Sequence, residues 1–234
     1  MSTYRIENCA GSAESARRAE LGGAYRVELC AGLPEGGTTP SYGEILTARR
    51  AISIKLNVII RPRSGDFLYT PIEVEAMLAD IRMARELGAD GIVVGCLTAD
   101  GAVDKPLLRR FVEAAEGLPV TFHRAIDVCQ DRAQALEDII EAGCARVLTS
   151  GGAASAPEGA DAIAALVKQA ADRIIIMPGA GVTPENVADL ARKTGAREFH
   201  FSGRTAEPSP MRYRHEGVSM GGTVTIDEYA YLFT

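Results

Sequence analysis

Leu87-Gly88-Ala89-Asp90-Gly91-Ile92-Val93-Val94-Gly95 is the stretch that decides the fold of this chain. It joins an Ala-, Leu- and Glu-rich segment to a short apolar run through a glycine. Glycine adopts the left-handed conformation that ends a helix at little steric cost. A short run of Ile and Val between glycines is typical of a buried strand. The stretch therefore predicts a helix end followed by a strand over Gly91–Gly95.

The same unit recurs along the chain. Glycines also close helix-like segments at Leu21-Gly22-Gly23, Ala142-Gly143-Cys144 and Thr194-Gly195-Ala196. Thr70-Pro71-Ile72-Glu73 carries the opposite signal, a capping box that begins a helix. Apolar runs rich in Val, Ile and Phe predict eight strands, at Tyr4–Cys9, Tyr25–Cys30, Lys55–Arg61, Gly91–Gly95, Val120–His123, Arg146–Ser150, Ile174–Met177 and Glu198–Ser202.

Helix-like segments separate these strands, which indicates parallel pairing because parallel neighbours need a long crossover. Eight such units in 234 residues, with no glycine-rich dinucleotide motif after the first strand, favour a closed (β/α)₈ TIM barrel over an open doubly wound sheet. We assign the barrel domain to residues 1–204. Residues 205–234 show no clear periodicity, and we expect a C-terminal arm that packs on the barrel or on a neighbouring subunit.

Composition limits the class of protein. The net charge is −6, which argues against a broad nucleic-acid surface. The sequence has neither a membrane-length apolar stretch nor an N-terminal signal pattern. Its five cysteines, an odd number, are better explained as reduced thiols than as a disulfide framework. We therefore expect a cytoplasmic protein without nucleic-acid or membrane partners.

The first two predicted strands share the pattern R-[IV]-E-x-C, repeated after 21 residues. Strand side chains alternate between the two faces of a sheet, and the outer face of a barrel must be apolar to receive helices. The pairs Glu7/Cys9 and Glu28/Cys30 should therefore point inward. In matching register the two thiols could share a soft metal ion, for which low-coordinate Cu(I) fits better than four-ligand zinc. The alternative is that both cysteines are small buried hydrophobic residues.

The third predicted strand ends in Arg61-Pro62-Arg63-Ser64-Gly65-Asp66. Two guanidinium groups beside a turn and an Asp resemble an anion clamp, because arginine holds carboxylate or phosphate with two parallel hydrogen bonds. Loops that follow barrel strands carry function, which favours this interpretation. A surface salt-bridge cluster of Arg61, Arg63 and Asp66 is the alternative.

Two of the three histidines, His123 and His200, end predicted barrel strands and should point inward at the mouth. Each could act as a general base, a metal ligand or a hydrogen-bonded core residue. Asp127 lies close enough in sequence to orient His123 or the adjacent Arg124. Small residues that suit an anion follow the last three strands: Ser150, Gly151, Gly179, Gly181 and Ser202.

Taken together, these segments resemble the CutC copper-homeostasis family over about Tyr4 to Arg204. The stretches that carry the resemblance are Glu7-Asn8-Cys9, Gly23–Cys30, Gly36–Ser41, Arg61–Phe67, Gly88–Gly95, Thr121–Asp127, Leu148–Gly151 and His200–Gly203. The resemblance implies a TIM barrel, a cytoplasmic homo-oligomer, and Cu(I) binding by thiols that map onto Cys9 and Cys30.

Two functions remain open at this point. One is a copper-homeostasis protein that binds Cu(I) through Cys9 and Cys30. The other is a TIM-barrel enzyme acting on a small phosphorylated or carboxylated metabolite. In that enzyme the Arg61–Asp66 loop would clamp the anion, and Glu7, Glu28 or His123 would transfer protons. The sequence alone leaves enzymatic activity undecided.

Overall fold

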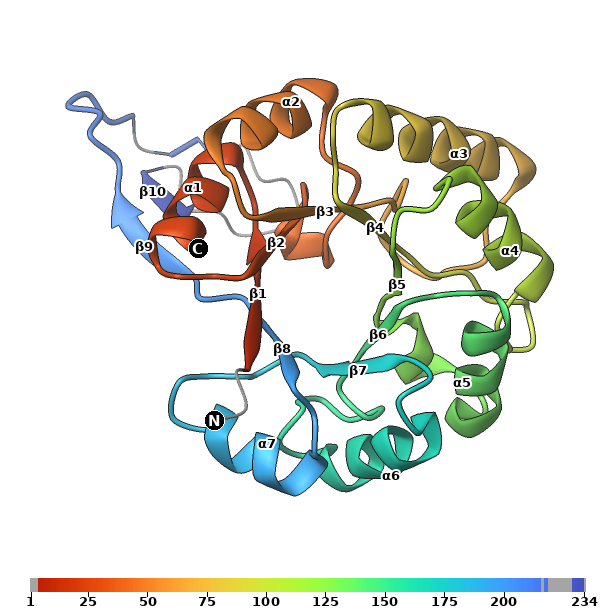
Figure 1. Cartoon of the computed structure of the whole chain (residues 1–234). Helices are drawn as coiled ribbons and strands as arrows, with labels where there is room; N and C mark the ends of the chain where they lie inside the picture. Colours follow the sequence, from red (N-terminus) through yellow and green to blue (C-terminus); the bar gives the residue numbers. More distant parts are fainter. Residues whose placement is uncertain (1–3, 216, 219–228, 234) are drawn as a thin grey trace.

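The computed structural model describes residues 4–215, 217–218 and 229–233. Eight strands form one parallel sheet that curls into a ring with helices outside it (Figure 1). The strands are β1 (Arg5–Ala10), β2 (Arg26–Leu29), β3 (Lys55–Ile59), β4 (Gly91–Val94), β5 (Val120–Phe122), β6 (Arg146–Thr149), β7 (Ile175–Pro178) and β8 (Glu198–Phe201). The helices are α1 (Ala13–Leu21), α2 (Tyr42–Ala51), α3 (Pro71–Glu86), α4 (Lys105–Ala114), α5 (Arg132–Glu141), α6 (Ala160–Ala170) and α7 (Val187–Thr194).

The sheet closes into the predicted TIM barrel. Hydrogen bonds join the strands in the order β7-β6-β5-β4-β3-β2-β1-β8, and each bonded pair is parallel. β7 and β8 lie side by side and complete the ring (Figure 1). All eight strands overlap the ranges predicted from sequence.

The helices begin and end where the sequence signals place them. At the start of α3 the Thr70 hydroxyl accepts from the Glu73 N–H, and the Glu73 carboxylate accepts from the Thr70 N–H at 2.7 Å. This is the predicted capping box. Gly88 follows α3 with φ +86°, a left-handed conformation that a side chain would strain. The helix signals thus fix the spacing of the strands.

Pleat alternation divides the core into two parts. Val27 and Leu29 of β2 face the helices, where they join a large apolar cluster that includes Met77 and Ile81 of α3. Toward the N-terminal ends of the strands, the inner faces carry buried charged residues such as Glu7, Arg26 and Glu198. Nearer the mouth lies a second apolar cluster, formed by Cys9, Cys30, Ile59 and Val93. The two Glu/Cys pairs point inward because they alternate along their strands with the apolar residues that face the helices.

The C-terminal arm contains an antiparallel pair of strands, β9 (Thr205–Pro208) and β10 (Ala230–Phe233), which the sequence did not predict. Arg18 of α1 forms an ion pair with Glu207, and its guanidinium lies 3.8 Å from the centre of the Phe233 ring. The described part of the arm therefore contacts α1. The rest of the predicted arm, residues 216, 219–228 and 234, lies outside the described residues. None of the described helices has the length and apolar character needed to span a bilayer.

Candidate functional site

A cavity of about 370 Å³ opens at the C-terminal ends of the barrel strands. This is the end at which TIM barrels place their functional sites. Half of its lining was predicted from sequence: Cys9, Glu28, Cys30, Arg61, His123, Arg124, Gly181, His200 and Ser202. The other lining residues are Leu33, Glu35, Gly36, Ile59, Phe67, Leu148, Ala180, Val182 and Arg204.

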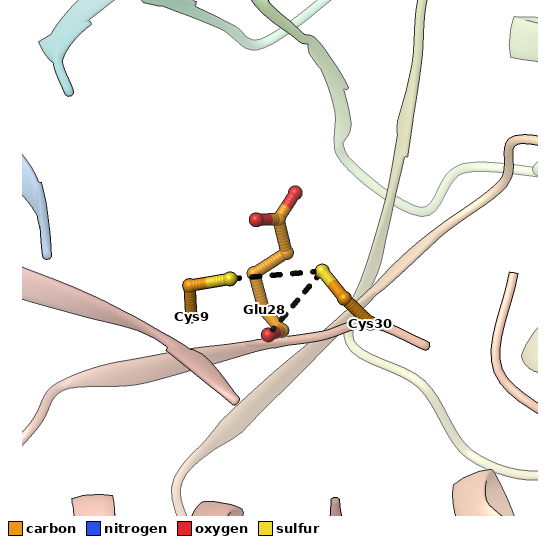
Figure 2. A group of neighbouring side chains, drawn as sticks. All are labelled: Cys9, Glu28 and Cys30. Atoms are coloured by element: carbon orange, nitrogen blue, oxygen red, sulfur yellow. Dashed lines mark hydrogen bonds between the residues drawn. The ribbon is translucent and has the colours of Figure 1, made fainter. Parts of the chain in front are cut away.

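The two inward cysteines form a close pair on one wall of this cavity. Their Sγ atoms lie 3.8 Å apart, and Figure 2 shows both thiols pointing toward each other beside Glu28. Cys9 pairs in register with Glu28, so Cys30 lies two residues beyond the partner of Cys9, just after β2. A closed barrel requires such stagger between neighbouring strands. The sulfur atoms and a Glu28 carboxylate oxygen lie within 4.8 Å of one another.

The two thiols differ in acidity. The hydrogen bond from Cys30, together with His200, holds the pKa of Cys9 well below its usual range despite burial. Donating that hydrogen bond and being buried raise the pKa of Cys30 well above its usual range. Cys9 is therefore the more acidic thiol of the pair and the one that loses its proton more readily. A thiolate is the form that binds metal.

His200 links the two glutamates beneath the thiols. Its Nδ1 lies 2.9 Å from a Glu7 carboxylate oxygen, and its Nε2 lies 3.6 Å from one of Glu28. Burial alone would raise the pKa of Glu7, but His200 and Arg26 outweigh it and lower the pKa to about 2. Burial raises the pKa of Glu28 to about 8. Burial would lower the pKa of His200, but Cys9 and the two glutamates raise it well above its usual range.

A buried ion network that sequence reasoning missed supports Glu7 from below. Arg26 forms an ion pair with Glu7 and places Nη2 2.8 Å from a Glu198 oxygen. Arg146 reaches the same Glu198 oxygen through Nε at 2.8 Å. Pleat alternation could have revealed these residues, because Arg26 shares a face with Glu28 and Glu198 shares one with His200. The network holds the Glu7 carboxylate in place, and through it the His200–Glu7 contact.

His123 faces the thiols from the end of β5. Its Nδ1 accepts a hydrogen bond from the Ala125 N–H at 3.1 Å, so the neutral ring carries its proton on Nε2. Burial and the charge of Arg61 lower the pKa of His123 to about 3. No described residue accepts a hydrogen bond from Nε2. A Cβ at Gly95 would overlap the imidazole, so the ring depends on that glycine for its place.

The loop after β3 separates its two arginines. Arg61 lines the cavity and donates to the backbone carbonyls of Glu35, Gly37 and Gly65. Arg63 is turned away: it pairs with Asp66 and with Glu73 of α3 and does not line the cavity. The structure therefore does not gather Arg61, Arg63 and Asp66 into one clamp. Arg63 and Asp66 form the salt-bridge cluster that was the alternative interpretation.

Asp127 joins the loops that follow β5 and β6. Its carboxylate accepts from Arg124 Nε at 2.8 Å and from the Ser150 hydroxyl at 2.9 Å. It also accepts from the backbone N–H of Ser150. Of the two partners considered for Asp127, the structure thus gives it Arg124 as its hydrogen-bond partner. Arg124 lines the cavity, whereas Asp127 and Ser150 lie behind it.

The predicted glycines serve close packing rather than direct lining, with one exception. A Cβ at Gly151 would overlap the Gly159 carbonyl, and one at Gly179 would lie 3.2 Å from the Cβ of His200. Gly181, with φ +70°, lines the cavity beside Ser202. The cavity-lining residues that sequence reasoning missed come mostly from loops, whose path depends on tertiary contacts.

Fold and cavity together define a class: (β/α)₈-barrel proteins with a buried thiol pair at the C-terminal mouth. Comparison with known families identifies the family within that class. The chain matches the model of the CutC family over residues 4–205 and belongs to this family. The resemblance predicted from sequence is confirmed.

Individual relatives agree with this assignment. The chain is 59% identical over 230 residues to a CutC family protein of Bacteroides thetaiotaomicron, covering 98% of this chain and 92% of that protein. It is 47% identical over 231 residues to the copper homeostasis protein cutC homolog of Homo sapiens, covering 99% and 85%. The solved structure of CutC from Streptococcus agalactiae matches with a TM-score of 0.81 at 36% identity, covering 85% of this chain and 98% of that one. A phosphonopyruvate hydrolase, at 16% identity, with a TM-score of 0.63 and coverage of 85% and 75%, shares the fold.

Proposed function

We propose that this chain is a copper-homeostasis protein that binds one Cu(I) ion through the Cys9 and Cys30 thiolates. The observation that carries the proposal is the 3.8 Å separation of the two Sγ atoms on the cavity wall. Metal–sulfur bonds of roughly 2.3 Å, as for zinc, are long enough to bridge this gap. Thiolate is a soft ligand, which selects Cu(I) over hard cations such as magnesium and calcium.

The surrounding donors favour low-coordinate Cu(I) over four-coordinate zinc. Glu28 offers a further ligand atom within 4.8 Å of both sulfurs. Burial raises the pKa of Glu28 to about 8, so at neutral pH it is largely a protonated, weak ligand. His200 contacts Glu7, Glu28 and Cys9, and despite burial these partners raise its pKa well above its usual range, which favours the protonated ring that binds no metal. Two thiolates are thus the donors offered to a metal that enters from the cavity.

Copper stoichiometry under anaerobic, reducing conditions tests this proposal. Wild type should retain about one Cu(I) per chain against a chromogenic Cu(I) chelator. Cys9→Ser and Cys30→Ser should each lose the ion to the chelator. Cys144→Ala, which removes a buried thiol from the helix-side core, is the matched control and should retain it. Equal retention by wild type and the Cys9→Ser/Cys30→Ser double variant would rule the proposal out.

Two further expectations belong to this proposal. A protein that holds Cu(I) through reduced thiols suits the cytoplasm, where thiols are kept reduced. We also propose a homo-oligomer, to which the C-terminal arm contributes. Light scattering coupled to size exclusion, on the full chain and on a chain ending at residue 204, measures both the oligomeric state and the part played by the arm.

A further inference from the structure

Two buried hydrogen-bond donors on the cavity wall lack acceptors among the described residues. They are Nε2 of His123 and Nε of Arg61, whose residues are 5% and 6% exposed. Both residues flank Phe67: the His123 ring centre lies 4.9 Å from the Phe67 ring centre, and the Arg61 guanidinium carbon lies 5.2 Å from it. Buried polar groups in folded proteins nearly always have partners. Two unpaired donors on residues that line one cavity indicate that an acceptor is supplied from outside the chain.

The positive charge of Arg61 indicates that the missing hydrogen-bond acceptor is an anion. Its described hydrogen bonds go to backbone carbonyls, and no carboxylate of the described residues lies within ion-pair distance. Two other arginines of the barrel differ, since Arg26 pairs with Glu7 and Arg124 with Asp127. A buried cation without a counter-ion is unfavourable. An anion in the cavity would compensate it.

The cavity also has more room than a metal ion needs. Its volume of about 370 Å³ lies in the range of small-molecule sites, roughly 300–1,000 Å³. Leu33, Ile59, Leu148 and Val182 give it an apolar lining suited to a carbon skeleton. Arg124 and Arg204 add positive charge to the lining. Its acidic residues are Glu28 and Glu35. These features fit a short organic anion better than an inorganic one.

We infer that the cavity binds a small carboxylate-bearing metabolite, whose carboxylate accepts hydrogen bonds from Nε2–H of His123 and Nε–H of Arg61. The ligand's carbon skeleton packs on the apolar lining. This site uses neither thiol, so it does not depend on copper. The low pKa of His123 keeps its ring neutral. It can therefore donate a hydrogen bond through Nε2 without adding a second buried positive charge to that of Arg61.

Nitrogen-15 histidine NMR on the metal-free, chelator-treated full chain tests this inference. The probes are short-chain mono- and dicarboxylates that include pyruvate, malate and 2-oxoglutarate, with malamide and inorganic phosphate as controls. The His123 Nε2–H signal, assigned through its loss in His123→Phe, is followed during each titration. At least one carboxylate should shift this signal saturably, and His123→Phe should weaken its binding by about tenfold or more.

Control variants separate this inference from copper binding. Arg192→Gln, which removes an exposed arginine on α7, should bind the carboxylate as wild type does. Cys9→Ser/Cys30→Ser should also bind it, and His123→Phe should still retain Cu(I). The inference is overturned if no carboxylate moves the Nε2–H signal, if malamide or phosphate binds as well as the acids, or if His123→Phe binds as tightly as wild type. The titration uses wild type, and where His123→Phe does not fold, correlation of the ring nitrogens with the His123 backbone assigns the signal in wild type instead.

Discussion

Cys9 lies opposite Glu28 across the β1–β2 ladder, not opposite Cys30. The thiol pair is therefore diagonal, and the two Sγ atoms point toward each other at a separation of 3.8 Å (Figure 2). Diagonal neighbours on one face of a sheet remain within reach of each other. The stagger that closes the barrel thus inserts a carboxyl group beside the two sulfurs. Several consequences of this arrangement can be measured.

Replacing Glu28 with glutamine should alter the pH dependence of stability in the metal-free protein. Burial raises the pKa of Glu28 from 4.5 to about 8, so between these values the folded state binds more protons than the unfolded state. Stability from this group is present below pH 4.5 and is lost as the pH rises toward 8. Glutamine does not titrate, so the Glu28→Gln variant does not lose this stability. Its unfolding free energy minus that of wild type should therefore rise by about 1 kcal/mol per pH unit between pH 4.5 and 8. Urea unfolding at a series of pH values measures the difference, and a flat difference would contradict it.

Replacing Glu7 with glutamine should have the opposite pH signature. His200 and Arg26 overcome the effect of burial and lower the pKa of Glu7 to about 2, so its stabilisation is present above pH 4.5 and is lost as the pH falls toward 2. Glu7→Gln should cost about 3 kcal/mol at neutral pH, because it leaves buried charges unpaired, and the cost should shrink in acid. Glu14→Gln, which breaks only exposed pairs on α1, is the control and should change stability far less. Equal effects of the two variants would show that the buried network contributes little.

The pKa values of the two cavity histidines should be shifted in opposite directions from that of a free imidazole. Burial lowers the pKa of His123 to about 3, whereas Cys9 and the glutamates raise that of His200 despite burial. His123 should therefore show one unprotonated and one protonated nitrogen with no titration between pH 5 and 8, whereas His200 should lose its second proton at a higher pH than a free imidazole. Nitrogen-15 NMR of histidine-labelled protein checks this. A sigmoidal His123 transition in that range would mean that its ring is solvated.

Replacing Gly95 with alanine should displace His123. The added Cβ would overlap the imidazole and lie 2.9 Å from the Cβ of Ala125, so we expect a loss of about 1–3 kcal/mol. Gly43→Ala is the matched control, because the nearest atom to its added Cβ is the Ser41 hydroxyl at 3.9 Å. It should leave stability unchanged or slightly higher. Indistinguishable unfolding midpoints for the two variants would contradict the close approach of His123 to Gly95.

The sequence predicts the strands and the inward face well, because both depend on local rules. Glycine at helix ends and a period of two along strands place Cys9, Glu28 and His200 in the barrel without knowledge of tertiary contacts. The same rule would have placed Arg26 and Glu198, had it been applied to every charged residue in the strands.

The loops were less predictable. Arg61 and Arg63 are two residues apart, yet one lines the cavity and the other pairs with α3. Which way such side chains turn depends on carbonyls and carboxylates that are distant in sequence. Register is likewise a global property, because the stagger of a closed barrel, rather than the matching R-[IV]-E-x-C motifs, sets Cys9 opposite Glu28.

X-ray absorption at the copper edge tests the central claim most directly. The full chain, loaded anaerobically with one equivalent of Cu(I), should show two sulfur neighbours per copper, and each single Cys→Ser variant at positions 9 and 30 should lose this signature. A wild-type spectrum with only nitrogen and oxygen neighbours, or one unchanged by either substitution, would contradict binding by the thiol pair.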